Sequence, residues 1–182
     1  RATVEVDVAL SDRVLVPERA QMKRMANNWP RDGVADNAIE ALYQQAGDFS
    51  SQAGGDDELR LQVEFDIGEL IGSSKDLQQV HLRLTPKTVS DPLDLDLVRV
   101  TERNYGRIST RDYATGSELV TVVDSQGWET GVARTIDVTE AVRTALANGD
   151  RYLALRLQPA SGPNDDGLPN YVEFEPTYAP NA

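Results

Sequence analysis

The chain has 182 residues, of which 40% are hydrophobic and 26% charged, and its formal net charge at pH 7 is −12. This length suits one domain with a single hydrophobic core, so two large domains are not expected. An acidic chain lacks the cationic surface on which sequence-independent nucleic-acid binding depends, because such binding releases counterions from phosphates. We therefore expect no nucleic-acid partner.

Cysteine is absent and His81 is the only histidine. These two facts exclude disulfides, thiolate nucleophiles and zinc sites that need two imidazoles. Charged residues interrupt every apolar run, so no stretch reaches the roughly 20 apolar residues of a membrane helix, and we expect no membrane insertion. The chain begins at Arg1 without an initiator Met. We interpret it as a processed or excised piece, for which a secretion signal is one candidate for the missing segment.

Alternation of apolar and polar side chains is the main pattern in the chain, and it predicts strands. The clearest case runs from Leu59 to Ile67, where every second residue is apolar. In chain order, the expected strands cover residues 4–10, 59–67, 80–84, 93–97, 118–123, 134–138, 153–157 and 171–175. Because nearly every strand has one apolar and one charged face, the strands fit antiparallel sheets stacked face to face. We predict an all-β, jelly-roll-like antiparallel β-sandwich that forms one domain over residues 1–182.

Two segments carry the spacing of a short helix. Apolar residues recur three and four positions apart over residues 34–45 and again over residues 138–147. For the second helix, Thr139 is the expected N-cap and Gly149 the expected left-handed terminator. The first helix falls within residues 17–57, which we interpret as an irregular insertion draped over the sandwich.

No motif in the chain indicates an enzyme. The nucleophile elbow, the zinc-binding helix, the phosphate-binding loop and the dinucleotide fingerprint are all absent from the sequence. Acidic pairs such as Asp94 with Asp96 could flank a glycosidase cleft, but an outward strand face explains them as solubilising charge. Asp165-Asp166 fits a turn better than an oxygen-ligated calcium site, because the ligand spacing matches no known calcium loop. We expect a protein without enzymatic activity or cofactor, and a structural calcium ion stays open.

Arginine and aromatic side chains supply the best candidate binding group. Arg60 and Arg83 fall on outward strand faces, and four more arginines recur between residues 99 and 111. Guanidinium groups bind carboxylates through paired hydrogen bonds and aromatic rings stack on sugars, so this mixture fits an acidic glycan. The alternative is that the arginines form internal salt bridges and that Trp128 closes one end of the core. The candidate ligand-binding residues are Arg60, Arg83, Tyr105, Arg107, Arg111 and Trp128.

Two segments resemble a known family. Residues 60–70, RLQVEFDIGEL, and residues 136–149, IDVTEAVRTALANG, resemble the DNRLRE-type β-sandwich domains grouped as carbohydrate-binding module family 96. In those domains a strand ending in Phe-Asp-Leu precedes one like residues 79–85, and an Asp-Val-Thr helix precedes one like residues 152–158. The order and spacing match across residues 58–175. Propeptides of the transforming growth factor β type contain a similar Asp-Val-Thr segment and look like the same sandwich.

The resemblance implies a non-catalytic module of a secreted or cell-surface protein, appended to a larger multidomain chain. Its implied partner is a polysaccharide, and an acidic one such as alginate is implied because some members bind alginate. The sequence departs from the family where Ala145 replaces a common Trp, and where Tyr105 lies near another. Two further functions stay open. One is a structural or adhesive spacer, and the other is a polysaccharide lyase that would use His81, Tyr105 and an arginine.

Overall fold

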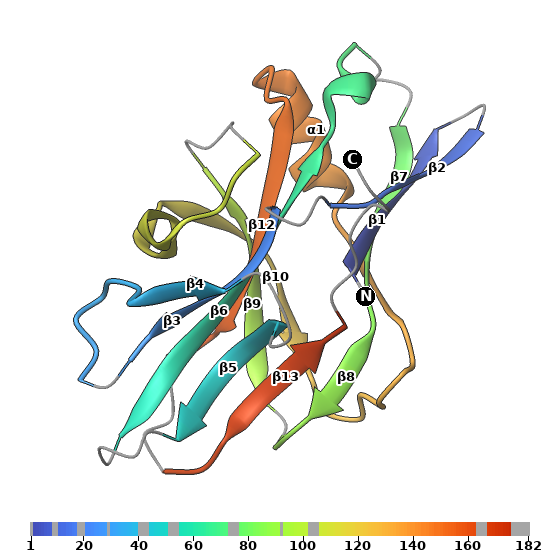
Figure 1. Cartoon of the computed structure of the whole chain (residues 1–182). Helices are drawn as coiled ribbons and strands as arrows, with labels where there is room; N and C mark the ends of the chain where they lie inside the picture. The colour runs from blue at the N-terminus through green and yellow to red at the C-terminus, as the bar shows by residue number, and fades with distance from the viewer. Residues whose placement is uncertain are drawn as a thin grey trace.

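The computed structural model describes residues 2–8, 11–17, 21–28, 30–39, 44–50, 55–72, 77–91, 93–101, 106–162 and 167–175. Within these ranges the chain forms antiparallel strands, one α-helix and short 3-10 turns (Figure 1). The strands are β1 (Ala2–Val8), β2 (Ser11–Leu15), β3 (Met22–Asn27), β4 (Asn37–Ile39), β5 (Gln44–Ser50), β6 (Asp56–Asp66), β7 (Leu77–Leu84), β8 (Pro86–Val89), β9 (Asp94–Val100), β10 (Ser117–Asp124), β11 (Arg134–Asp137), β12 (Tyr152–Pro159) and β13 (Asn170–Phe174). The helix is α1 (Thr139–Ala147), and the 3-10 turns are η2 (Gly68–Leu70) and η3 (Thr110–Ala114).

The strands form two packed sheets, which confirms the predicted all-β antiparallel sandwich. The smaller sheet has the order β11-β7-β1-β2. The larger runs β10-β9-β12-β6-β5-β13-β8, with β3 paired to β6 and β4 paired to β3. Strand β13 thus lies between β5 and β8, which are far from it in the sequence (Figure 1).

Strand β6 organises the larger sheet because three strands pair with it. Strand β12 pairs over residues 61–66, β5 over residues 56–59, and β3 over residues 58–63. A strand has only two edges, and β3 overlaps both of the others. It follows that β5 and β12 share the edge opposite β3 one after the other. The sheet therefore divides at β6 into a β12-β9-β10 branch and a β5-β13-β8 branch.

The main core fills the space between these layers. It includes Leu61 and Phe65 of β6, Leu82 of β7, and Val172 and Phe174 of β13, all at most 2% exposed. Because side chains alternate along a strand, Tyr171 and Glu173 of β13 point to the opposite side from Val172 and Phe174. The β5-β13-β8 branch therefore has one face in the core and an outer face whose residues range from buried (Glu173, 6% exposed) to exposed (Phe49, 43%).

The segment predicted as an insertion is built into the larger sheet. The helix predicted over residues 34–45 is wrong, because residues 37–39 form β4 and residues 44–50 form β5. Val34, which that helix would bury, is 57% exposed. Strands β3 and β5 both pair with β6, so cross-strand hydrogen bonds decide the conformation here and the local helical spacing does not.

Helix α1 confirms the second predicted helix but starts differently from the prediction. Val138 occupies the N-cap position, and Asp137 Oδ1 accepts hydrogen bonds from the Thr139 backbone N–H and hydroxyl at 2.8 and 2.6 Å. The Thr139 hydroxyl oxygen in turn accepts the Val80 N–H at 2.9 Å. Thr139 therefore fastens the helix to β7 and does not cap it. Gly149 follows the helix with φ +76°, as predicted.

Candidate functional site

Arg60 lies in a buried polar cluster on the face of β6 turned away from the main core. Its Nε is 2.6 Å from Glu58 Oε1, its Nη1 donates to the Tyr113 carbonyl at 2.7 Å, and its guanidinium stacks 3.9 Å from the Tyr113 ring centroid. Arg156 of β12, which is 2% exposed, donates to the carbonyls of Asp112 and Tyr113 at 2.9 and 3.1 Å. Burial, and then the charge of Arg60, lower the pKa of Arg156 to about 10, so it stays a cation at pH 7. These two arginines hold η3 on the sheet.

The remaining predicted ligand residues are spread over the molecule. Arg107 and Arg111 are exposed on the segment that contains η3. Trp128 is half-buried and packs edge-on against Phe174 at the main core, with 6.1 Å between ring centroids. Tyr105 lies outside the described residues. The structure thus brings Arg111 near the Arg60 cluster and places Trp128 in the role of closing the core.

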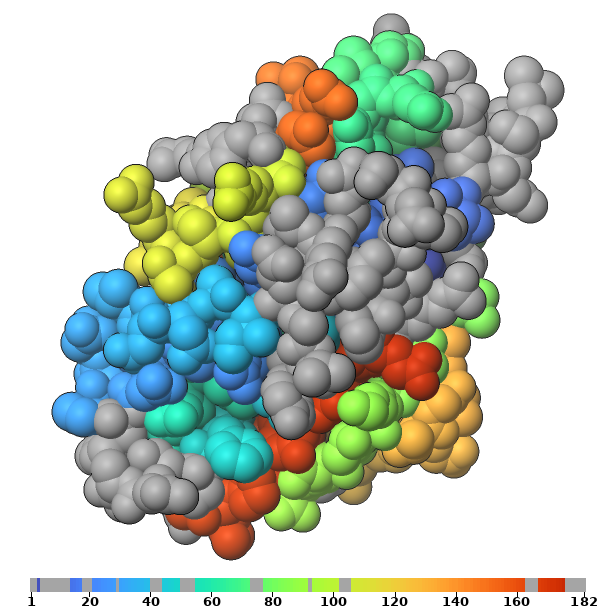
Figure 2. Space-filling view, in the orientation of Figure 1, coloured from blue at the N-terminus to red at the C-terminus, as the bar shows by residue number. Residues whose placement is uncertain are grey.

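The outer surface of the β5-β13-β8 branch joins aromatic and charged side chains that no single sequence segment contains. Figure 2 shows the atoms of these three strands side by side on the surface. We call this surface, with the adjoining end of β7, the front face. Its outward residues are Gln45, Phe49, Arg83, Lys87, Tyr171, Glu173 and Glu175.

An aromatic pair lies at one end of the front face. Phe49 of β5 is 43% exposed, and its ring centroid lies 5.7 Å from that of Tyr171, with an angle of 46° between the rings. Gly47 allows this arrangement, because it has φ +134° and a Cβ there would lie 2.2 Å from the Asn170 carbonyl oxygen. Strands β5 and β13 can therefore approach closely beside the two rings.

A buried carboxylate lies next to the aromatic pair. Glu173 Oε1 accepts a hydrogen bond from Lys87 Nζ at 2.7 Å, and Glu173 Oε2 accepts one from Gln45 Nε2 at 3.2 Å. Gln45 Oε1 accepts from Arg24 Nη1 at 3.1 Å. The Glu173 side chain is 7% exposed and that of Lys87 is 50% exposed. A buried anion thus fixes an amine at the surface through charge-assisted bonds, two residues along β13 from Tyr171.

A groove of about 470 Å³ lies beside Glu175, where the end of β13 meets the junction of β7 and β8. Its polar lining is Arg83, Glu175, Thr3 and Thr85. Arg83 and Thr3 in this lining are paired residues of β7 and β1 in the smaller sheet. The Glu175 N–H donates to the Thr85 carbonyl at 3.3 Å, which keeps the end of β13 beside the junction of β7 and β8. A guanidinium, a carboxylate and two hydroxyls can donate and accept hydrogen bonds, which suits a ligand rich in hydroxyl or carboxylate groups.

A larger cavity, of about 600 Å³, lies between α1 and β10 and includes Gln79, Thr121 and Asp137 in its lining. No aromatic side chain lines it. Hydrogen bonds from Thr139 hold the pKa of Asp137 below its usual value. The Asp137 carboxylate already accepts hydrogen bonds at the start of α1, and no aromatic ring lines this cavity. We therefore place the candidate site on the front face.

The described residues contain no group of three His, Asp or Glu side chains that could hold a metal ion. Asp165 and Asp166, where a calcium ion was considered, lie outside those residues. His81 points outward on β7 and is register-paired with Asp137 of β11. None of the helices among the described residues is long and apolar enough to cross a membrane.

Sequence reasoning missed the aromatic pair for two different reasons. Tyr171 shares the polar phase of its strand with Glu173, and an aromatic residue in that phase was a usable signal. Phe49 gave no signal, because its strand was not predicted.

Comparison of the sequence with models of known protein families gave no match, and comparison with curated proteins gave none either. The resemblance to family 96 therefore stays a prediction.

Proposed function

We propose that the protein is a non-catalytic carbohydrate-binding module of a secreted or cell-surface protein, and that its front face binds a polysaccharide. The observation that supports this is the pair of the exposed Phe49 and the half-buried Tyr171 beside the buried Glu173 and its hydrogen-bond partners. A sugar ring offers an apolar C–H face and a rim of hydroxyls. Aromatic rings that stack and polar groups held in fixed positions match both features.

Cations on the front face favour an anionic polysaccharide such as alginate. Lys87 and Arg83 are both exposed there and can donate to a uronate carboxylate. The net charge of −12 repels an anion at long range, but physiological salt screens exposed charges beyond about 8 Å. The contacts made at the face then decide the affinity. A neutral glycan, bound by stacking and hydroxyl contacts alone, is the alternative ligand.

Affinity gel electrophoresis tests the proposal directly. Gels containing alginate, pectin, a sulfated galactan or a neutral β-glucan should retard the wild-type protein on at least one polysaccharide, with alginate the first choice. The double variant Phe49→Ala/Tyr171→Ala should lose most of the retardation, because each stacked ring contributes about 1 kcal/mol. Leu119→Ala is the matched control, since Leu119 is 60% exposed on β10, away from the front face. Absence of wild-type retardation on all four gels would overturn the proposal.

A structural or adhesive spacer is the second candidate function. It is favoured by the internal use of Arg60, Arg156 and Arg99, the last of which pairs with Glu118 at 2.6 Å. A spacer would migrate unretarded through every gel. The lyase would instead release an unsaturated product, seen as ultraviolet absorbance when the protein is incubated with alginate.

A further inference from the structure

We infer that the front face binds an internal stretch of a polysaccharide chain, which reaches from the Phe49–Tyr171 pair to the Arg83 groove. This rests on the proposed function and specifies its ligand. The ligand is an oligosaccharide segment of about three or more sugar units, and neither a chain end nor a single sugar satisfies the site.

The first argument is the direction of β13. Tyr171, Glu173 and Glu175 alternate with the fully buried Val172 and Phe174, so all three point to the same side. At about 3.3 Å per residue, Tyr171 and Glu175 are about 13 Å apart along the strand. This exceeds the length of one pyranose ring, so the aromatic pair and the groove contact different sugars.

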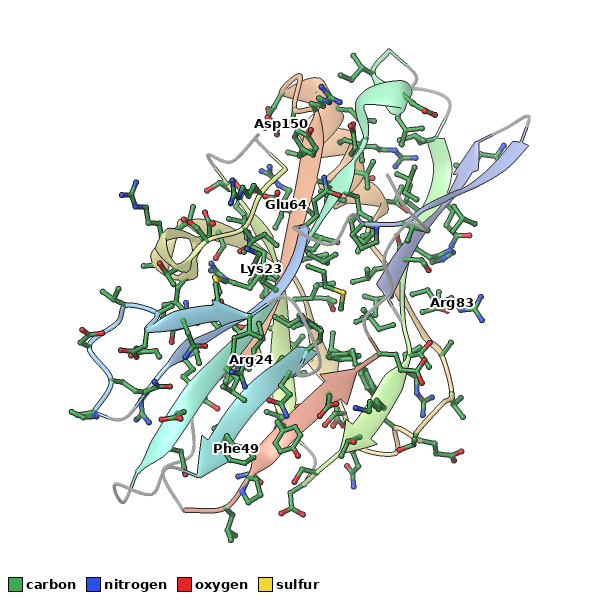
Figure 3. The ribbon with its side chains drawn as sticks, viewed as in Figure 1. Lys23, Arg24, Phe49, Glu64, Arg83 and Asp150 are labelled. Atoms are coloured by element: carbon green, nitrogen blue, oxygen red, sulfur yellow. The ribbon has the colours of Figure 1, made fainter. Side chains whose placement is uncertain are left out.

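The second argument is the neighbouring strand β8, whose residues lie beside Glu173 and Glu175. Lys87 of β8 reaches Glu173, and the Thr85 carbonyl accepts the Glu175 N–H, so residues 87 and 85 lie beside residues 173 and 175. The β8–β13 register shifts between Glu173 and Phe174. Arg83 precedes this pairing on β7 of the smaller sheet, and it lines the same groove as Thr85 and Glu175. Arg83 therefore lies at the end of this surface away from Tyr171. Figure 3 shows Phe49 near the lower end of the molecule and Arg83 well apart from it on the right.

The third argument is the chemistry along the surface from the aromatic pair to the Arg83 groove, which we call the track. The aromatic end offers stacking, the middle offers the Lys87 amine, and the far end offers the Arg83 guanidinium with the Thr3 and Thr85 hydroxyls. Phe49 and Lys87 remain 43% and 50% exposed, so neither is enclosed by the described residues. A chain can therefore pass beyond the aromatic pair, whereas recognition of a chain end needs a closed pocket.

The test is calorimetric titration with a length series of mannuronate oligomers, from disaccharide to hexasaccharide. Wild-type affinity should rise steeply up to the tri- or tetrasaccharide and then level off. Arg83→Gln should weaken hexasaccharide binding by about tenfold, as expected for one charge-assisted contact, and leave disaccharide binding at the aromatic end unchanged. The control Arg111→Gln removes another exposed guanidinium, on the η3 segment, and should bind every oligomer like the wild type.

The possible results separate the two proposals. Disaccharide binding as tight as hexasaccharide binding, or an Arg83→Gln variant that binds the hexasaccharide normally, would overturn the track while leaving carbohydrate binding intact. Absence of wild-type binding to every oligomer, together with no retardation in the gels, would overturn the proposed function and this inference with it. Urea unfolding of Arg83→Gln should match that of the wild type, which checks that the exposed substitution leaves the fold intact.

Discussion

Replacement of Arg156 by methionine should release the η3 segment from the sheet. Arg156 is 2% exposed, and its guanidinium donates to the carbonyls of Asp112 and Tyr113, to Ser117 Oγ and to Gln158 Oε1, all within 3.2 Å. Each hydrogen bond from a charged donor is worth about 1.5–3 kcal/mol. The Tyr113 carbonyl keeps its bond from Arg60, and removal of a buried cation recovers part of the desolvation cost. We therefore expect a loss of about 3 kcal/mol in the free energy of unfolding.

Urea denaturation followed by circular dichroism measures this loss. Arg111→Met is the matched control, because Arg111 is exposed on the same segment and its replacement should change stability by no more than about 0.5 kcal/mol. Hydrogen exchange gives a second readout, since amides of residues 112–117 should lose protection in Arg156→Met before the rest of the sheet does. Equal stability of the two variants would refute the reasoning and show that the buried apolar cluster of Tyr113 and Ile108 with Met25 and Ala35 holds the segment.

Three further predictions concern single residues. Asp137→Ala should lower the free energy of unfolding by about 1 kcal/mol at pH 7, because Asp137 accepts the first N–H of α1. Hydrogen bonds from Thr139 depress the pKa of Asp137 in the folded state. The stabilisation by Asp137 is therefore present above its unfolded-state pKa and should vanish as the pH falls through its folded-state pKa. A difference between the wild-type and Asp137→Ala melts that persists at the acid limit would contradict this prediction. Gly47→Ala should cost about 1–3 kcal/mol through the clash with β13, and Gly72→Ala, at φ +95° with open space around it, should cost less; equal losses in thermal melts would dismiss the clash. Trp128→Phe should retain gel retardation, since Trp128 packs against the core. A loss of retardation at unchanged stability would instead show that Trp128 contributes to the binding site.

Much of the sandwich could be predicted because the period of a half-buried strand is local information. Strands β6 and β12 place apolar residues on the core face and mostly polar residues on the other, so their sequences alternate and both were found. This alternation holds even though some of the polar residues, such as Glu64 and Arg156, are buried. In β5, buried polar residues such as Gln44 and Asp48 also occupy the phase that faces the core, so apolar and polar residues do not alternate. In β5, Asp48 is 2% exposed and accepts the Asn170 N–H at 3.1 Å. A partner so distant in the chain leaves no periodic signal, which explains why this part of the sheet was missed.

The candidate site was predicted less completely than the fold. Arg83 was correctly predicted to point outward from its strand, and it is exposed and lines a groove. The outward phase of Arg60 was also correct, but η3 covers that face of β6. Whether a segment about fifty residues away lies over a strand depends on tertiary packing, and alternation within the strand contains no information about it. The pairing of Phe49 with Tyr171 depends on the β5–β13 register in the same way.

Backbone chemical-shift mapping with the oligosaccharide that binds most tightly tests the position of the binding surface most directly. Front-face binding predicts that ¹H–¹⁵N shifts concentrate in residues 44–50, 83–88 and 170–175, with residues 107–117 unchanged. Shifts centred on residues 107–117, or shifts absent at saturating ligand, would contradict front-face recognition of a polysaccharide.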